Sequence, residues 1–246
     1  YRDVLVTGSN RGIGLELVRQ LAASPQPPQH IFATCRDPDG PRGKALRELS
    51  AQHPSIRLVQ LVDLPSIRRA VQVVESCLEG QGLNLLINNA GIGSHATLPE
   101  TLKRVCINRA WVSLCQEFLP LLEKAAKGAQ KTGLSCSRAA IVNVSSKVGS
   151  IGHWGPWRGA HGVVLAWPCL FQAAQNMVTR CLAAELRDKG LLCTAIHPGW
   201  VKTDMGTEQA PMTVERSVQG ILAVLGSLSQ ETSGAFLDWE GNSLPW

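Results

Sequence analysis

The stretch Val4-Leu5-Val6-Thr7-Gly8-Ser9-Asn10-Arg11-Gly12-Ile13-Gly14 decides the fold. A short apolar run enters a glycine-spaced turn, and a helical pattern of apolar residues follows it. The first glycine permits a tight reversal, the second lets backbone approach a pyrophosphate, and the third lets the helix pack on the sheet. The helix N-terminus then presents free N–H groups to the anion. This order predicts a dinucleotide-binding turn; the alternative is an ordinary glycine-rich loop.

Length and composition predict one domain covering residues 1–246. Of the 246 residues, 44% are hydrophobic, which supplies a sizeable core. The net charge of +5 is spread along the chain without a basic block, so we expect no nucleic-acid partner. No apolar run reaches the ~18 residues of a membrane span, so we expect no membrane association.

The eight cysteines show no C-x-x-C pair and no metal-ligand spacing, and we expect no metal site. Several of them lie inside apolar runs, as reduced core thiols do. This usage favours the cytoplasm over secretion.

Strand-like and helix-like runs alternate along the whole chain. Strands are expected at 3–7, 30–35, 56–61, 83–87, 139–145, 191–196 and 234–238. Helices are expected at 13–23, 41–52, 66–79, 100–105, 109–127, 171–188 and 213–228. Continuous apolar strands separated by helices predict an α/β fold with a doubly wound, Rossmann-type parallel sheet covered by helices on both faces.

Small, polar or glycine-rich clusters follow most of these strands, at 7–14, 36, 63, 88–91, 145–146 and 198–203. In open parallel sheets ligands bind outside the carboxyl ends of the strands. The clusters therefore predict one ligand site along that edge of the sheet.

These clusters, in this order, resemble the short-chain dehydrogenase/reductase family over essentially the whole chain. The T-G-x-x-x-G-x-G turn at 7–14 matches the family's cofactor loop, and N-N-A-G at 88–91 matches the motif after its fourth strand. I-V-N-V-S-S at 141–146 matches the strand that ends in the active-site serine. P-G-W-V-K-T at 198–203 matches the element beside the nicotinamide. The local sequences at 33–38, 118–122 and 234–238 are similar to those of the C-factor/sniffer branch of carbonyl-reductase-like members.

The resemblance implies an oxidoreductase that transfers hydride between a nicotinamide cofactor and a small-molecule carbonyl substrate. It also implies a homodimer through the fifth and sixth helices, at 109–127 and 171–188. Ser146 would polarise the substrate oxygen, and Asn108 would help hold a proton-relay water. The implied cofactor-binding residues are Thr7, Gly8, Ser9, Asn10, Arg11, Gly12, Ile13, Gly14, Arg36, Asp63, Asn89, Ala90, Gly91, Pro198, Gly199, Val201 and Thr203.

The choice of cofactor follows from charge at the end of the second strand. NAD binders place a carboxylate there, whereas a cation favours the 2′-phosphate of NADP. Here Cys35 fills that position and Arg36 follows it, with Arg11 in the glycine turn. An arginine fork suits phosphate, so we expect NADP(H). The alternative is that Arg36 is the first solvated residue of a loop.

Two of the implied residues have a plain structural alternative. Asp63 matches an aspartate that contacts adenine in the family, and it would serve equally as a helix N-cap. Asn108 lies in an atypical neighbourhood, where an ordinary helix asparagine is the other interpretation.

The family's proton donor is missing. The family uses a tyrosine, activated by a lysine one helical turn later, to protonate the developing alkoxide. The only tyrosine here is Tyr1. The stretch A-A-Q-N-M at 173–177 is similar to the one that follows the lysine in related members, which puts Gln172 at the lysine position and Pro168 at the tyrosine position. We therefore predict impaired catalysis.

No other group has a spacing that replaces this pair. His153, His161 and Lys147 are the nearest candidates, and nothing in their spacing aims them at a nicotinamide. The residues that differ from the family's sequence pattern are concentrated near 62–65, 100–111 and 151–172. Such patches fit either a non-catalytic module that binds NADP(H) or a partner, or an imperfect gene model, and their clustering favours the second.

Overall fold

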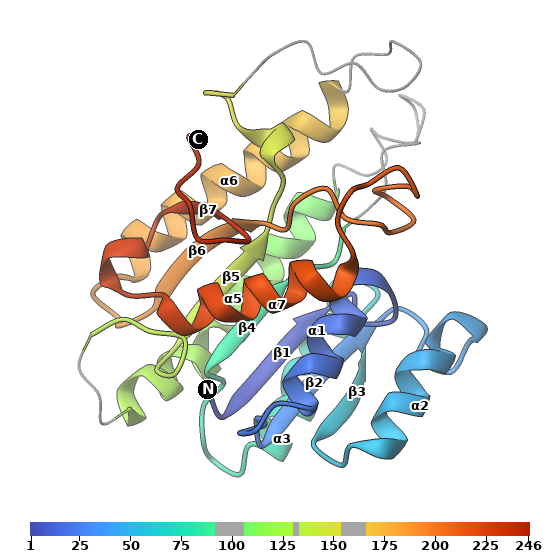
Figure 1. Cartoon of the computed structure of the whole chain (residues 1–246). Coiled ribbons are helices and arrows are strands. Elements are labelled where there is room, and N and C mark those ends of the chain that lie inside the picture. The colour runs from blue at the N-terminus through green and yellow to red at the C-terminus, as the bar shows by residue number, and fades with distance from the viewer. Residues whose placement is uncertain (92–105, 130–132, 154–165) are drawn as a thin grey trace.

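The computed structural model describes residues 1–91, 106–129, 133–153 and 166–246 (Figure 1). Seven strands form one parallel sheet in the order β3-β2-β1-β4-β5-β6-β7. The strands are β1 (Asp3–Thr7), β2 (His30–Cys35), β3 (Ile56–Gln60), β4 (Leu85–Asn88), β5 (Ala140–Val144), β6 (Leu192–His197) and β7 (Phe236–Asp238). The doubly wound sheet predicted from the sequence is confirmed.

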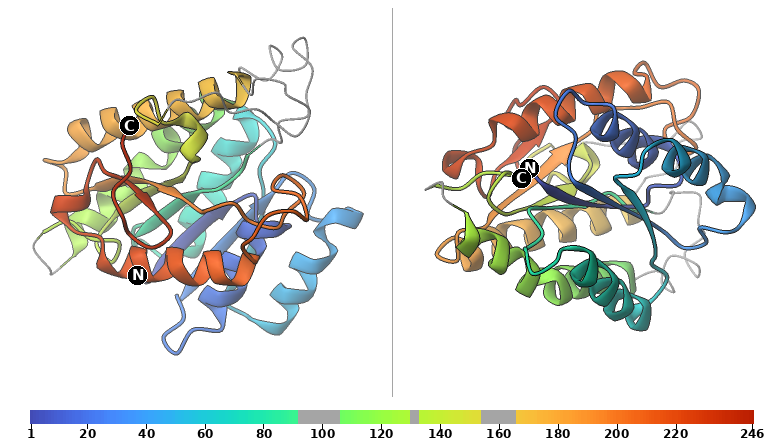
Figure 2. Two further views of the ribbon diagram at one scale, coloured as in Figure 1. Left: turned by 45° about the horizontal axis from the view of Figure 1, so that its top comes forward. Right: turned by 90° about the horizontal axis from the view of Figure 1, so that it is seen from below.

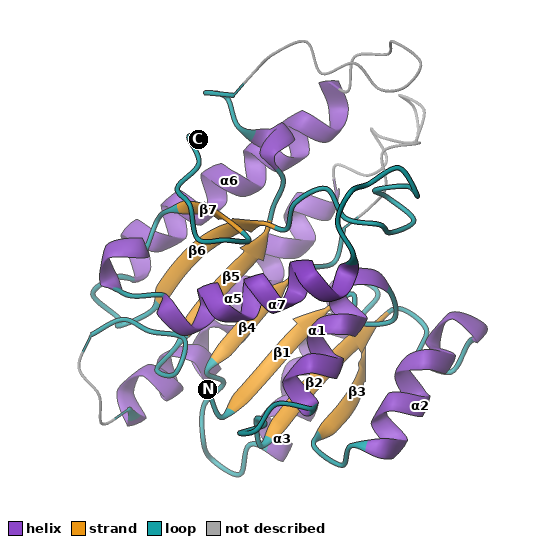
Figure 3. Cartoon of the chain, in the orientation of Figure 1, coloured by secondary structure: helices purple, strands orange, loops and turns teal. Residues whose placement is uncertain are grey.

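Helices cover both faces of this sheet (Figures 2 and 3). The described helices are α1 (Gly12–Ala22), α2 (Lys44–Gln52), α3 (Leu64–Cys77), α5 (Cys106–Gly128), α6 (Ala166–Leu186) and α7 (Val214–Ser227). Short 3₁₀ turns are η1 (Pro41–Gly43), η2 (Lys147–Gly149) and η3 (Gln230–Thr232). Within the described residues, no helix is long and apolar enough to cross a membrane.

Strand order reverses beside β1. The chain runs outward from β1 through β2 to β3 and then returns to place β4 on the other side of β1. Val4 accordingly pairs with Ile31 of β2 and with Leu85 of β4. At such a switch point the loops after the two inner strands diverge, and a crevice opens at their carboxyl ends.

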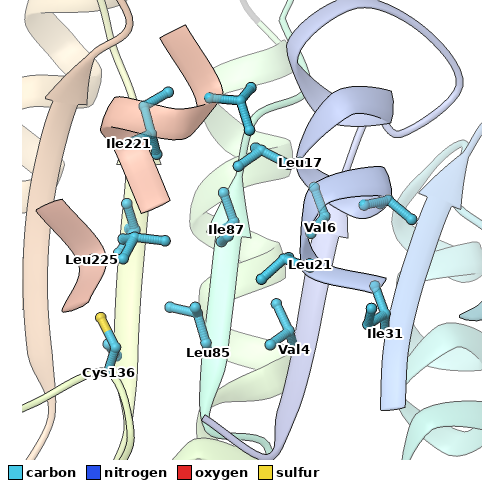
Figure 4. Packing of buried hydrophobic residues seen from close by; sticks show 14 of the residues in the cluster. Val4, Val6, Leu17, Leu21, Ile31, Leu85, Ile87, Cys136, Ile221 and Leu225 are labelled. Atoms are coloured by element: carbon cyan, nitrogen blue, oxygen red, sulfur yellow. The ribbon is translucent and has the colours of Figure 1, made fainter. Parts of the chain in front are cut away.

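Successive side chains along a strand point to opposite faces of the sheet, so each strand contributes to two hydrophobic cores, one on each face. Val4 and Val6 of β1 face one side and pack with Leu17 and Leu21 of α1, and Ile221 of α7 belongs to the same cluster (Figure 4). Leu5, between the two valines, faces the opposite core, which is built with α3, α5 and α6 around the fully buried Phe118. Because these strands are buried on both faces, their sequences read as continuous apolar runs.

All strand boundaries agree with the prediction to within two residues, whereas α2, α5 and α6 begin three, three and five residues away from their expected starts at 41, 109 and 171. Leu83 is buried but precedes β4, because its N–H donates to the carbonyl oxygen of Leu121 in α5 at 3.0 Å. Helix α6 begins at Ala166 and not at 171. Pro168 therefore falls in the first turn, where a missing N–H costs no helical hydrogen bond. The helix expected at 100–105 lies outside the described residues.

Candidate functional site

A cleft of about 660 Å³ opens at the carboxyl ends of the strands around β1. Residues 7–8 and 10–13 of the glycine turn line it, together with 89–91, Arg36 and Thr203. The first and last of these residues, Thr7 and Thr203, are 196 positions apart in the sequence, and all of these segments were predicted to form one site. The structure brings them together.

Thr7 joins the two sequence motifs. Its hydroxyl oxygen accepts the backbone N–H groups of Asn89 and Ala90, each at 2.9 Å. The side-chain amide of Asn89 donates to the carbonyl oxygen of Thr7, also at 2.9 Å. Three hydrogen bonds thus hold the glycine turn against the end of β4, so the two motifs are fixed relative to each other in the cleft lining.

Two glycines in the turn are required by close backbone contact. Gly8 has φ +68°, and a Cβ there would lie 2.9 Å from the Cα of Ala90. A Cβ on Gly14 would lie 2.2 Å from the carbonyl oxygen of Gly8. Gly14 does not line the cleft; it lets α1 begin directly against the turn.

The N-terminus of α1 is suited to binding an anion. Its N-cap residue, Arg11, makes no side-chain capping hydrogen bond, and the first turn carries no acidic residue. The free N–H groups of that turn and the helix dipole favour a negatively charged group. The cleft also contains Arg11, Arg36 and Arg42, so its charge fits a phosphorylated ligand.

Arg42 is a charged cleft residue that sequence reasoning missed. It follows Arg36 by six residues, and its carbonyl oxygen accepts the side-chain amide of Asn10 at 3.4 Å, which anchors this segment beside the glycine turn. The signal was present in C-R-D-P-D-G-P-R at 35–42, where a second arginine follows a turn-forming stretch.

Asp37 also lines the cleft, where its single negative charge is outnumbered by the three arginines. Its carboxylate accepts the backbone N–H of Gly40 at 2.9 Å and so closes the turn before η1. Cys35, at the position where NAD binders carry an acid, is 5% exposed and also lines the cleft.

Ser9 and Asp63 lie outside the cleft lining. Ser9 is fully buried, and its hydroxyl donates to the carbonyl oxygen of Val6 at 2.8 Å. Asp63 is the N-cap of α3 and forms a capping box with Ser66. Hydrogen bonds from Ser66 lower the pKa of the Asp63 carboxyl. Of the two interpretations of Asp63, the structure shows the N-cap.

The residues at 198–201 position Thr203 but do not line the cleft themselves. The carbonyl oxygen of Pro198 accepts the Ser217 hydroxyl of α7 at 2.6 Å. Gly199 has φ +88°, and Val201 forms an isolated parallel bridge with Met212. The chain after β6 is thereby turned back over the glycine turn.

Ser146 lies two residues after the end of β5 and is the N-cap of η2, where its hydroxyl accepts the N–H of Val148 at 3.4 Å. The preceding hydroxyl, that of Ser145, donates to Oδ1 of Asn176 at 2.5 Å and to Oε1 of Gln172 at 3.2 Å. The Gln172 amide therefore faces Ser145. Ser146 does not line the cleft formed by the described residues.

A buried amide chain fixes α6 against the sheet. Asn88 of β4 donates to Asn143 of β5 at 2.8 Å, and Asn143 donates to Thr179 of α6 at the same distance. Gln172 lies two turns before Thr179 on the same helix, so its place opposite Ser145 follows from this anchoring.

The remaining predicted catalytic positions are located by backbone alone. Pro168 is the third residue of α6, one turn before Gln172, and Asn108 lies in the first turn of α5. His161 lies outside the described residues. His153 donates its backbone N–H to the Ser150 hydroxyl at 3.0 Å.

The segment after Ser146 is held by residues from the far end of the sequence. The Ser150 hydroxyl donates to the carbonyl oxygen of Pro245 at 2.6 Å, and the N–H of Gly152 donates to that of Trp246 at the same distance. The Trp246 ring stacks on Phe236 with centroids 5.4 Å apart, and Arg180 of α6 lies over it. We call residues 245–246 the terminal clamp.

His197, at the end of β6, should make stability depend on pH. Burial, followed by the charge of Lys147, lowers the pKa of its imidazole from 6.5 to about 4, against a smaller opposing effect of Asp238. Its Nδ1 accepts the N–H of Lys147 at 3.3 Å, which fits a neutral ring. Between pH 6.5 and 4 the unfolded chain binds a proton that the folded chain does not, so stability falls as pH falls through that window.

We expect this group to remove roughly 1–3 kcal/mol of unfolding free energy between pH 7 and pH 4. Urea unfolding of the chain and of His197→Asn, which keeps a hydrogen-bond acceptor, measures the difference. His53→Asn, at the end of α2, is the control. Equal pH dependence in all three proteins would contradict this assignment.

The fold and the cleft define a class: a doubly wound α/β protein with a dinucleotide-binding cleft at its topological switch point. A family model described as short chain dehydrogenase matches residues 2–156. The chain belongs to the short-chain dehydrogenase family.

Individual relatives place it in the carbonyl-reductase-like branch. The crystal structure of NADPH-bound carbonyl reductase from chicken fatty liver is 47% identical, with a TM-score of 0.91 over 100% of this chain and 99% of that one. Carbonyl reductase Sniffer of Drosophila melanogaster is 35% identical, with the same TM-score and coverage. An oxidoreductase of Schizosaccharomyces pombe is 30% identical over 98% of this chain and 96% of its own length.

Proposed function

We propose that this chain binds NADP(H) in the cleft around the glycine turn and is an oxidoreductase by class whose turnover of carbonyl substrates is very low or absent. One domain, residues 1–246, would carry this function. When bound, the cofactor supplies hydride; the chain's residues hold and orient it. The relatives support the choice of ligand, since the chicken carbonyl reductase is described as NADPH bound.

The observation that carries the proposal is the uncapped N-terminus of α1 in a cleft with three arginines. Free backbone N–H groups in the first turn fit a pyrophosphate. Arg36 directly follows β2, where the ribose 2′-position is read in this fold, and Arg42 lines the same cleft from η1. A guanidinium fork matches phosphate geometry. Asn89, Ala90 and Gly91 supply the opposite wall.

Low turnover follows from the side chains at the catalytic helix. A glutamine at 172 carries no positive charge to lower a neighbouring pKa, and its amide is engaged with Ser145. Proline at 168 has no proton to donate. Ser146 alone remains of the family's set of serine, tyrosine and lysine, and loss of general acid catalysis costs about 10²–10⁴ in rate. If turnover is absent altogether, the chain is a non-catalytic module that binds NADP(H), which is the alternative function.

The proposal predicts micromolar binding of NADPH without appreciable oxidation. The measurement is a titration that follows NADPH fluorescence, continued with a panel of aldehydes and ketones while absorbance at the nicotinamide band is recorded. Gly14→Val, whose side chain would collide with the Gly8 carbonyl oxygen, is the non-binding control. Absence of binding by the unaltered chain would refute the cofactor assignment, and rapid oxidation would refute the assignment of Pro168 and Gln172.

Two further assignments complete the proposal. We place a homodimer contact on α5 and α6, because Leu170 and Met177 of α6 are 58% and 62% exposed and lie two turns apart on the helix. We place the protein in the cytoplasm, because Cys115, Cys136 and Cys193 are buried free thiols.

A further inference from the structure

The loop that follows β6 crosses the mouth of the cleft. Thr203 and Met205 both line the cleft. The Cγ2 atom of Thr203 lies 3.4 Å from the position that a Cβ of Gly12 would occupy, and Cε of Met205 lies 3.7 Å from the same position at Gly91. Gly12 belongs to the turn after β1, and Gly91 follows β4. Residues 203–205, which we call the strap, therefore span the cleft between its two walls.

The strap is a compact turn with a fixed base. The N–H groups of Gly206 and Thr207 donate to the hydroxyl and carbonyl oxygens of Thr203 at 3.0 and 2.9 Å. The N–H of Lys202 donates to the carbonyl oxygen of Met212 at 2.8 Å, which closes the loop at its base. These hydrogen bonds stiffen the strap internally, so its contacts with the cleft walls decide whether it stays over the cleft.

One charged contact joins the strap to the glycine turn. The Asp204 carboxylate of the strap accepts from the Arg11 guanidinium, although the two residues are 193 positions apart in the sequence. Thr203 and Met205 add apolar side-chain atoms beside Gly12 and Gly91. Among the described residues, this is the one ion pair that crosses the cleft mouth.

The same pair changes the role expected for Arg11. From the sequence, Arg11 was expected to join Arg36 in binding the 2′-phosphate. In the structure a carboxylate offsets its charge, and its guanidinium points to the strap, whereas no ion pair is formed by Arg36 or Arg42 within the described residues. The turn beneath the strap is the part of the site suited to the pyrophosphate, which NADPH and NADH share.

We propose that the Arg11–Asp204 pair ties the strap over the bound dinucleotide and slows the dissociation of NADPH and NADH alike. Discrimination between the two cofactors then falls to Arg36 and Arg42. This inference rests on the proposed function, because it requires a dinucleotide in the cleft. The effect is modest, since the side chains of Arg11 and Asp204 are 45% and 77% exposed and solvent screens such pairs.

Stopped-flow displacement of NADPH and of NADH tests the strap. Asp204→Asn should raise both dissociation rates by the same factor, roughly two- to five-fold. Glu208→Gln is the matched control, because it removes the same charge from an exposed position in the same loop. Arg11→Met combined with Asp204→Asn should raise the rates no further than Arg11→Met does alone, because the two changes remove one interaction.

Three results would contradict the proposal that the Arg11–Asp204 pair holds the strap over the dinucleotide. One is unchanged rates in Asp204→Asn, and another is an effect equal to that of Glu208→Gln. The third is a change confined to NADPH, which would mean that Asp204 competes with the 2′-phosphate for Arg11. Amide hydrogen exchange over 202–210 gives a readout without cofactor, and it should be faster in Asp204→Asn than in Glu208→Gln. Failure of the unaltered chain to bind NADPH would refute the proposed function. The hydrogen-exchange comparison would then still test whether the Arg11–Asp204 pair holds the strap in place.

Discussion

A chain carrying Pro168→Tyr together with Gln172→Lys is expected to oxidise NADPH with aldehydes or ketones about 10²–10⁴-fold faster than the unaltered chain. The two residues are four positions apart on α6, so a tyrosine and a lysine there would lie one above the other on one helix face. The lysine charge would favour the phenolate and so lower the tyrosine pKa, which makes the hydroxyl a proton donor near neutral pH. Steady-state oxidation of NADPH, followed by absorbance, measures the gain.

The single changes are the controls for this prediction. Pro168→Tyr alone lacks the neighbouring charge and Gln172→Lys alone lacks the proton donor, so each should recover far less than the pair. Ser146→Ala in the double variant should lower the recovered rate again if, as we propose, Ser146 polarises the substrate oxygen. Should the double variant bind NADPH and still fail to oxidise it, the placement of these residues at the catalytic positions would be wrong.

Replacing Arg36 and Arg42 together by methionine is expected to weaken NADPH binding by roughly 10²-fold, while NADH binding changes by less than about three-fold. Each lost charge-assisted hydrogen bond to phosphate is worth about 1.5–3 kcal/mol before solvent screening reduces it. NADH lacks the 2′-phosphate, so it does not use these contacts. The dissociation constants of both cofactors, measured by fluorescence at fixed ionic strength, show whether the double change weakens NADPH binding more than NADH binding.

Arg57→Met is the matched control for this change. Arg57 is an exposed arginine on β3 that does not line the cleft, so its loss lowers the net charge without touching the site. A comparable weakening in Arg57→Met would show that general electrostatic attraction, and not direct contact, holds the phosphate. Equal losses for NADPH and NADH in the double variant would contradict the assignment of these arginines.

Much of the fold could be predicted because its signals are local. Alternation of apolar runs with helical patterns located the strands within one or two residues, and burial on both faces explains why those runs are continuous. The two motifs that meet through Thr7 were predicted to share a site, since the carboxyl ends of parallel strands meet at one edge of the sheet.

The features that escaped prediction depend on contacts between distant residues. Nothing near Arg11 in the sequence indicates Asp204, because the pair forms only when the loop after β6 folds back over the turn after β1. Arg42 becomes a cleft residue because the chain turns through Asp37 and Gly40. The role of Asp63 was open, since a capping carboxylate and a ligand-binding one look alike in sequence.

The terminal clamp has a consequence for the order in which the molecule matures during synthesis. Ser150 receives its hydrogen-bond partner from Pro245, 95 residues further along the chain. At 5–20 residues per second, a ribosome needs roughly 5 to 20 s to supply that partner. The early strands β1 to β5 and their helices can pair during this interval. The segment beside Ser146 cannot, so the cleft walls at 7–13, 36–42 and 89–91 can form before the terminal clamp fixes that segment.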